Sequence, residues 1–210
     1  MKSCLLLAIL TIGCSVSQAD TILFTTFGAG QSYDTSNGYT INAGNELAAS
    51  FSSPLYAQLL SVDVAVEADA PDDQFTMYIE SGDSGPTTIL DTISGLTFPQ
   101  APSSAVINVP SVAQPAILPG ETYWVVLAFN SGSGTSGAWM DNNIGAAGNG
   151  MVASGNGNDG STWNSPVDTF LPAFDVVGGV PEPSSIALAG LGLGIAAAIR
   201  ARRVRSLRPR

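Results

Sequence analysis

Between Asp20 and Val180 the chain contains no lysine, arginine, histidine or cysteine. The protein has 17 Asp and Glu residues, and all of them except Glu182 lie in this stretch. Salt bridges between side chains and disulfides are therefore impossible there, so any fold must rest on apolar packing and backbone hydrogen bonds. The stretch is long enough for one domain with a real hydrophobic core.

Hydrophobic periodicity in this stretch has a period of two. Over residues 59–67, Val62, Val64 and Val66 alternate with polar residues such as Asp63 and Glu67, which predicts a half-buried strand. We also expect a strand buried on both faces at 122–129, where nearly every residue is β-branched or aromatic, and further strands at 46–51, 75–79, 87–93, 104–109, 137–140 and 168–176. Turn-forming residues separate these segments, so the pattern predicts an all-β fold, a single antiparallel β-sandwich of jelly-roll type.

The N-terminus has the features of an export signal. Lys2 supplies a positive charge, residues 5–12 form a short apolar run, and small residues precede Asp20. This order predicts a signal peptide at 1–19 with cleavage before Asp20. A lipoprotein signal ending at Cys14 is the alternative interpretation, because a small residue precedes that cysteine.

The C-terminus has three consecutive parts. A short signature comes first, an apolar segment at 184–199 follows it, and a basic cluster comes last. The signature consists of Val180, Pro181, Glu182 and Pro183, and the basic cluster consists of Arg200, Arg202, Arg203 and Arg205. The apolar segment is shorter than the roughly 20 residues of a comfortable transmembrane helix. Basic residues favour the cytoplasmic side, so the segment predicts a short transmembrane helix whose C-terminal end lies in the cytoplasm.

In this order of parts the tail resembles a PEP-CTERM sorting segment. The resemblance implies export in a Gram-negative-type bacterium that makes extracellular polysaccharide, and an exosortase-type transpeptidase as the partner that recognises and cleaves the tail near Pro181–Pro183. The expected layout is a signal peptide at 1–19, a β-sandwich domain at 20–179 and a sorting and anchor segment at 180–210. A plain anchor helix with a stop-transfer cluster is the alternative. The same tail is also catalogued as an ice-binding protein C-terminal domain, but the body shows no repeated threonine array, so we do not expect ice binding.

The body resembles a second exported module. Ala48-Ala49-Ser50-Phe51, the alternating strand through Val66, and above all Leu118-Pro119-Gly120-Glu121-Thr122-Tyr123-Trp124-Val125-Val126-Leu127 are similar to the choice-of-anchor R domain. That family appears attached to different surface anchors. The resemblance implies a β-sandwich displayed at the cell surface and no settled biochemical activity.

The missing residue types exclude most enzyme classes. Without histidine there is no Ser-His-Asp or Cys-His nucleophile system, and without lysine in the body there is no Schiff base or P-loop. The absence of basic residues also argues against nucleic acid as a partner. A pair of carboxylates acting on a glycosidic bond is the chemistry left open, with Asp63, Glu67, Glu80 and Asp141 as candidates. We expect a protein that is not an enzyme.

Loops rich in Asn, Asp and Gly supply the hard oxygen ligands that calcium prefers. The candidate ligands are Asp141, Asn143, Asn158 and Asp159, although none of these loops has EF-hand spacing. The alternative is that these residues simply form turns. We therefore expect no cofactor, with calcium as the alternative.

Two tryptophans lie beside Gly-, Ser- and Asn-rich segments. Exposed aromatic faces stack on sugar rings, so Trp139 and Trp163 are candidate glycan contacts. Alternatively they pack in the core or hold long loops against the sandwich. The complete sequence predicts an exported, non-enzymatic surface or matrix protein, membrane-anchored before its tail is processed. The alternative function is a carbohydrate-binding module for exopolysaccharide, with or without calcium.

Overall fold

A computed structural model of the chain describes residues 18–132, 136–154, 163–164 and 171–181. These residues contain strands and no helix, so the all-β prediction is confirmed for them. Most of the predicted signal peptide and the whole predicted C-terminal helix at 184–199 lie outside the described residues. Among the residues described, no helix is long and apolar enough to cross a membrane.

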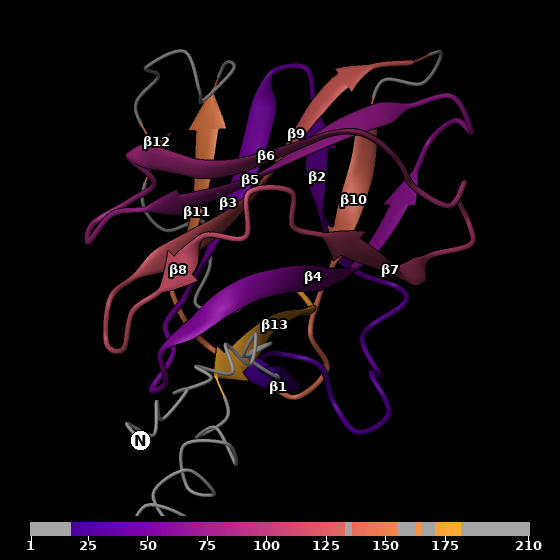
Figure 1. The fold of residues 1–210 in the computed structure, drawn as a ribbon. Coiled ribbons are helices and arrows are strands. Elements are labelled where there is room, and N and C mark those ends of the chain that lie inside the picture. Colours follow the sequence, from indigo (N-terminus) through magenta and orange to yellow (C-terminus); the bar gives the residue numbers. More distant parts are fainter. Residues whose placement is uncertain (1–17, 133–135, 155–162, 165–170, 182–210) are drawn as a thin grey trace, which may run out of the picture. The chain divides into compact units, whose positions relative to one another are not determined.

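The strands belong to one large, mainly antiparallel sheet (Figure 1). Along its main path the order is β1-β13-β4-β10-β2-β3-β9-β5-β6, while β7 and β8 pair with β4, and β11 pairs with β3 and β12. The bounds are β1 Gln18–Thr25, β2 Gly38–Asn42, β3 Asn45–Phe51, β4 Ala57–Ala68, β5 Gln74–Ser81, β6 Thr88–Thr97, β7 Ala105–Pro110, β8 Ala116–Ile117, β9 Tyr123–Ser131, β10 Ser136–Met140, β11 Gly150–Ser154, β12 Trp163–Asn164 and β13 Phe174–Pro181. The pairing is continuous and does not separate two sheets, so a jelly-roll sandwich stays a prediction.

Residues Asp20–Val180 form one compact unit. Its main core is built by alternate residues that β4, β5, β9 and β13 direct to the same side, including Val62, Val64, Val66, Phe75, Met77, Ile79, Val125, Leu127, Phe174 and Val176. Strands that are distant along the sheet share this core, because the sheet curves around it. Backbone pairing and apolar burial thus replace the ion pairs that the composition forbids.

The alternation predicted in β4 is present. Val62, Val64 and Val66 are at most 1% exposed, whereas Asp63 and Glu67 occupy the opposite face and are only half-buried. Strand β9 is buried on both faces, as predicted: Val125 and Leu127 enter the main core, and the intervening residues enter a second cluster with Ala48 and Met151.

Candidate functional site

The sorting signature begins where the sheet ends. Val180 packs against the main core, and Pro181 is the last residue of β13. Glu182, Pro183 and the basic cluster from Arg200 to Arg205 lie outside the described residues. The predicted recognition sequence therefore follows directly from a strand that pairs with the central strand β4.

Trp139 lies in the core. Its side chain is 0% exposed, its Nε1 donates a hydrogen bond to the Ala173 carbonyl at 3.1 Å, and its ring meets Phe174 edge-on at a centroid distance of 5.6 Å. A fully enclosed ring offers no face to a sugar. This corrects the expectation of a glycan contact at Trp139 and favours the core alternative.

Trp163 is placed differently. It lies in β12, opposite Ala153 of β11, and packs partly buried against the cluster that contains Trp124 and Met151. Its indole thus covers the outer face of β9 and keeps some exposed surface. A glycan contact at Trp163 stays a prediction.

Of the four predicted calcium ligands, only Asp141 and Asn143 lie within the described residues. Asp141 is half-buried and holds its loop by backbone bonds, donating from its N–H to the Asn37 carbonyl at 3.0 Å. Asn143 is exposed, and Asn158 and Asp159 lie outside the described residues. Among the residues described, no group of three or more His, Cys, Asp or Glu side chains could hold a metal ion. Neighbouring Asn142 acts as a turn former, accepting from the Ala146 N–H at 2.8 Å.

Several carboxylates are buried. Glu80 is 3% exposed, and burial raises its pKa. Burial also raises the pKa of Asp175, while the side chains of Thr25 and Gln31 lower it and the charge of Asp63 raises it further. Of the four carboxylates named as glycosidase candidates, Glu80 is thus enclosed, whereas Asp63, Glu67 and Asp141 are half-buried.

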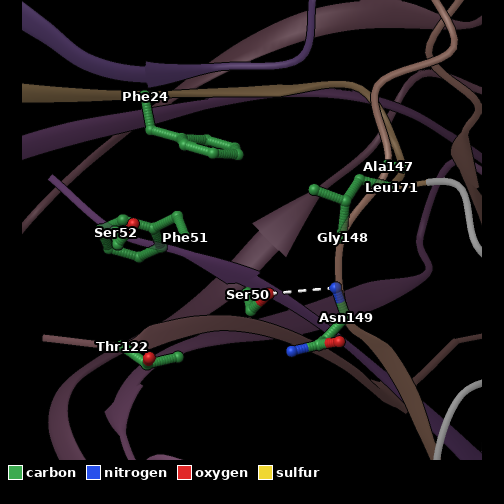
Figure 2. Close-up of a pocket in the computed structure, with 9 residues that line it drawn as sticks. All are labelled: Phe24, Ser50, Phe51, Ser52, Thr122, Ala147, Gly148, Asn149 and Leu171. Atoms are coloured by element: carbon green, nitrogen blue, oxygen red, sulfur yellow. Dashed lines mark hydrogen bonds between the residues drawn. The ribbon is translucent and has the colours of Figure 1, made fainter. Parts of the chain in front are cut away.

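A groove of about 210 Å³ lies beside the end of β3. Figure 2 shows the Phe24 ring at one end, the Ser50 hydroxyl in the middle, and the Asn149 side chain at the other side. The lining also includes Phe51, Ser52, Thr122, Ala147, Gly148 and Leu171. No lining residue is charged, in a body that carries only carboxylates.

Three segments supply most of the groove lining, and Thr122 and Leu171 complete it. Phe24 comes from β1, residues 50–52 from the end of β3, and residues 147–149 from the loop before β11. Ser50 joins two of them, because its N–H donates to the Asn149 carbonyl at 3.0 Å and its Oγ accepts from the Asn149 N–H at 3.3 Å. Gly148 permits the close approach of Leu171, whose Cδ1 would lie 2.6 Å from a Cβ at that position. An aromatic ring beside hydroxyl and amide groups can bind a neutral, hydroxyl-rich ligand.

The groove was not predicted, because its residues are far apart in the sequence. Ser50 and Phe51 were notable only for the family resemblance, and Phe24 and Asn149 carried no signal of their own. β1 and β3 belong to one sheet but are not neighbours in it. The contact of the Phe24 and Phe51 rings, with centroids 6.2 Å apart, and the backbone bond from Ser50 to Asn149 bring these residues to one place.

The comparisons with known proteins identify the tail. Residues 179–203 match the family model of the PEP-CTERM protein-sorting motif. This motif indicates an exported protein that an exosortase-type system sorts at the cell envelope. No curated protein matches the chain. A solved structure, the clostridial cysteine protease Cwp84 after propeptide cleavage, is similar at a TM-score of 0.46 and 15% identity. The match covers 68% of this chain and 37% of that chain, and a likeness at this level says nothing about activity.

Proposed function

We propose that this protein is a non-enzymatic surface or matrix protein, whose β-domain is exported and then released from a membrane-bound precursor by an exosortase-type transpeptidase. The observation that carries the proposal is the PEP-CTERM match at residues 179–203, which begins inside the last strand of the folded body. The last strand of the folded body and the sorting motif therefore share residues 179–181. The β-domain is the part that is exported, and the tail is its sorting signal.

The proposed order of events follows the three predicted parts. A signal peptide at 1–19 starts export, and the apolar segment at 184–199 holds the precursor in the inner membrane. The arginines from Arg200 to Arg205 keep the tail end in the cytoplasm. Residues 20–179, proposed to be a β-sandwich of the choice-of-anchor R type, then reach the cell surface or the extracellular matrix.

Composition supports a passive rather than a catalytic body. Nucleophile systems that depend on histidine, lysine or cysteine cannot form between Asp20 and Val180. The carboxylates of Glu80 and Asp175 are each 3% exposed, so neither lies open to a polymeric substrate.

A truncated chain tests the sorting proposal. A chain that ends at Pro181 keeps the whole of β13 but lacks the rest of the tail. We expect cells to export it without retention at the membrane or the surface, so that it accumulates in the medium, whereas the full chain stays with the cell envelope. Fractionation with antibody detection checks this result. Identical envelope retention of both chains would contradict the proposal.

Carbohydrate binding is the second candidate function, and the groove beside β3 favours it. Its lining combines the Phe24 ring with the polar groups of Ser50, Ser52, Thr122 and Asn149 and holds no charge. The body as a whole carries carboxylates and no basic residue, so it would repel anionic polymers, and the candidate ligand is a neutral glycan of the exopolysaccharide.

Ser52→Trp tests the groove. Ser52 is exposed at its edge, so an indole there would fill the space without disturbing the core. If the groove binds glycan, we expect the affinity for purified neutral exopolysaccharide to fall by roughly tenfold or more, as measured by calorimetry. Ser103→Trp, at another exposed serine outside the groove, is the matched control and should bind like the parent. No saturable binding by the parent, or equal binding by both variants, would exclude this site.

A further inference from the structure

A second groove, of about 530 Å³, lies between the hairpin of β5 and β6 and the chain that runs from β8 to the start of β9. Figure 1 shows this hairpin and β8 on the same side of the body. Two carboxylates line the groove: Asp83 comes from the turn of the hairpin, and Glu121 comes from the turn before β9. We call it the acidic groove. Its volume lies within the range of roughly 300–1,000 Å³ that is usual for ligand pockets.

Backbone and indole hydrogen bonds hold the two turns against each other. Ser81, at the end of β5, lies directly opposite Tyr123, at the start of β9. Next to them, the Gly82 N–H donates to the Thr122 carbonyl at 3.3 Å. The Gly82 carbonyl accepts a hydrogen bond at 2.7 Å from Nε1 of Trp124, whose side chain is 0% exposed. The sheet and the core therefore position the lining before any ligand binds.

The two carboxylates of the acidic groove are uncompensated. Asp83 and Glu121 are both exposed, and in the described part of the chain no group donates a hydrogen bond to either carboxylate. No lysine, arginine or histidine exists between Asp20 and Val180. Each carboxylate can therefore accept hydrogen bonds from a ligand, and a groove lined by charge of one sign concentrates molecules of the opposite charge. The charge complementary to this groove is positive.

The rest of the lining suits an organic cation better than a metal ion. Leu90, Ala116 and Leu118 supply apolar surface, and the Leu118 side chain is 46% exposed. Such surface contacts the carbon atoms of a ligand, whereas calcium and magnesium are surrounded by oxygen ligands. Among the described residues, no group of three or more acidic side chains could hold a metal ion. The groove therefore matches a cation that has a carbon skeleton.

Hydroxyl groups of the lining add neutral hydrogen-bonding capacity. The Tyr123 hydroxyl oxygen accepts from the Leu118 N–H at 2.9 Å, and no described residue accepts its proton, although the side chain is only 4% exposed. A buried donor without an acceptor is costly, so a ligand oxygen at this hydroxyl is favourable. The Thr87 hydroxyl donates to the Ser81 carbonyl at 2.7 Å, which leaves its oxygen able to accept from a ligand. A ligand that carries hydroxyl groups as well as a positive charge matches both kinds of group.

An extended peptide fits this lining less well than a sugar. Peptides commonly bind by adding a strand to an open sheet edge, where they pair with free backbone groups. Here the N–H groups of Gly82, Thr87 and Leu118 are already bonded within the domain. Recognition must therefore come from side chains, which favours a compact ligand that carries its amine and its hydroxyl groups on one ring.

We propose that the acidic groove binds an amine-bearing sugar unit of a glycan. The carboxylates of Asp83 and Glu121 hold the protonated amine by charge-assisted hydrogen bonds, and the C–H face of the sugar ring packs on Leu118. The sugar hydroxyl groups bond with the hydroxyls of Tyr123 and Thr87. This site is separate from the neutral groove beside β3, and the proposal depends neither on sorting nor on glycan binding in that groove.

Titration with defined oligosaccharides tests the proposal. The protein purified from its own cells is titrated by calorimetry with a glucosamine tetramer, in low-salt buffer at a mildly acidic pH that keeps the sugar amines protonated. We expect saturable binding with a Kd below about 1 mM. The N-acetylglucosamine tetramer, which is uncharged, should bind at least about tenfold more weakly. Asp83→Asn and Glu121→Gln should each weaken glucosamine binding by roughly tenfold, because each removes a charge-assisted hydrogen bond.

Asp72→Asn is the matched control. It removes one negative charge, as the site variants do, but Asp72 is exposed in the turn before β5 and does not line the groove, so this variant should bind like the parent. All three side chains are exposed, so the thermal unfolding of the variants should resemble that of the parent. The proposal is overturned if the parent does not bind saturably, if both site variants bind like the control, or if the two tetramers bind equally. Tighter binding of tetralysine than of the glucosamine tetramer would identify a basic peptide as the ligand and also overturn it.

Discussion

Trp139→Ala is expected to lower the free energy of unfolding by about 3–5 kcal/mol, the usual cost of truncating a fully buried large aromatic side chain. Its indole is 0% exposed, donates to the Ala173 carbonyl, and packs edge-on against Phe174. Removal would leave a cavity between β10 and β13 and an unpaired carbonyl. Both losses fall in the interior, where neighbouring side chains relax only partly.

Denaturant unfolding of the purified variants measures this effect. Trp163→Ala is the matched control, because Trp163 is only partly buried in the two-residue strand β12 and should cost clearly less. Comparable small losses for both variants would show that Trp139 is not the core residue described here. Because Trp139 lies in the core, any fall in glycan binding by Trp139→Ala should match the fraction of unfolded protein, since the substitution removes no glycan contact.

Replacing Glu182 and Pro183 with alanine is expected to abolish sorting. These residues lie within the matched stretch 179–203 and follow directly on β13, so the change leaves every residue of the folded body in place. Without its recognition sequence the tail should remain uncut. The full-length precursor would then accumulate in the membrane fraction, and the surface form would be lost.

Immunoblotting of membrane, surface and medium fractions checks this prediction. Pro119→Ala with Glu121→Ala is the matched control, since this proline and this carboxylate are exposed in the turn before β9. The control should be processed like the parent. Normal surface display of the Glu182 and Pro183 variant would mean that the signature is not the recognition sequence.

Local patterns in the sequence predicted those strands in which the order of apolar and polar residues along the strand itself decides which face is buried. In β4 the valines at 62, 64 and 66 alternate with polar residues, and in β9 an unbroken apolar run is buried on both faces. In these segments the side chains themselves determine which face is buried, so the period of two is enough to find them. The strands β2 and β11 have only five residues each and were not predicted, because their pairing with β10 and β3 fixes them as strands.

Long-range pairing explains what the sequence could not show. Trp139 was assigned from its Gly- and Ser-rich surroundings, but its burial depends on Phe174 and Ala173, which only β13 brings close. The groove residues and the Asp63–Asp175 pair are likewise assembled from separate strands. The sorting motif could be found from the sequence, because its residues are contiguous and no long-range pairing is needed to bring them together.

Cleavage of the tail is tested most directly by the mass of the protein recovered from the cell surface, with both of its ends mapped by peptide mass spectrometry. We expect a chain that begins at Asp20 and ends near Pro181–Pro183, without the arginines of the tail. A surface protein that retains Arg200–Arg205 would contradict processing by an exosortase-type system and leave the tail as an ordinary membrane anchor.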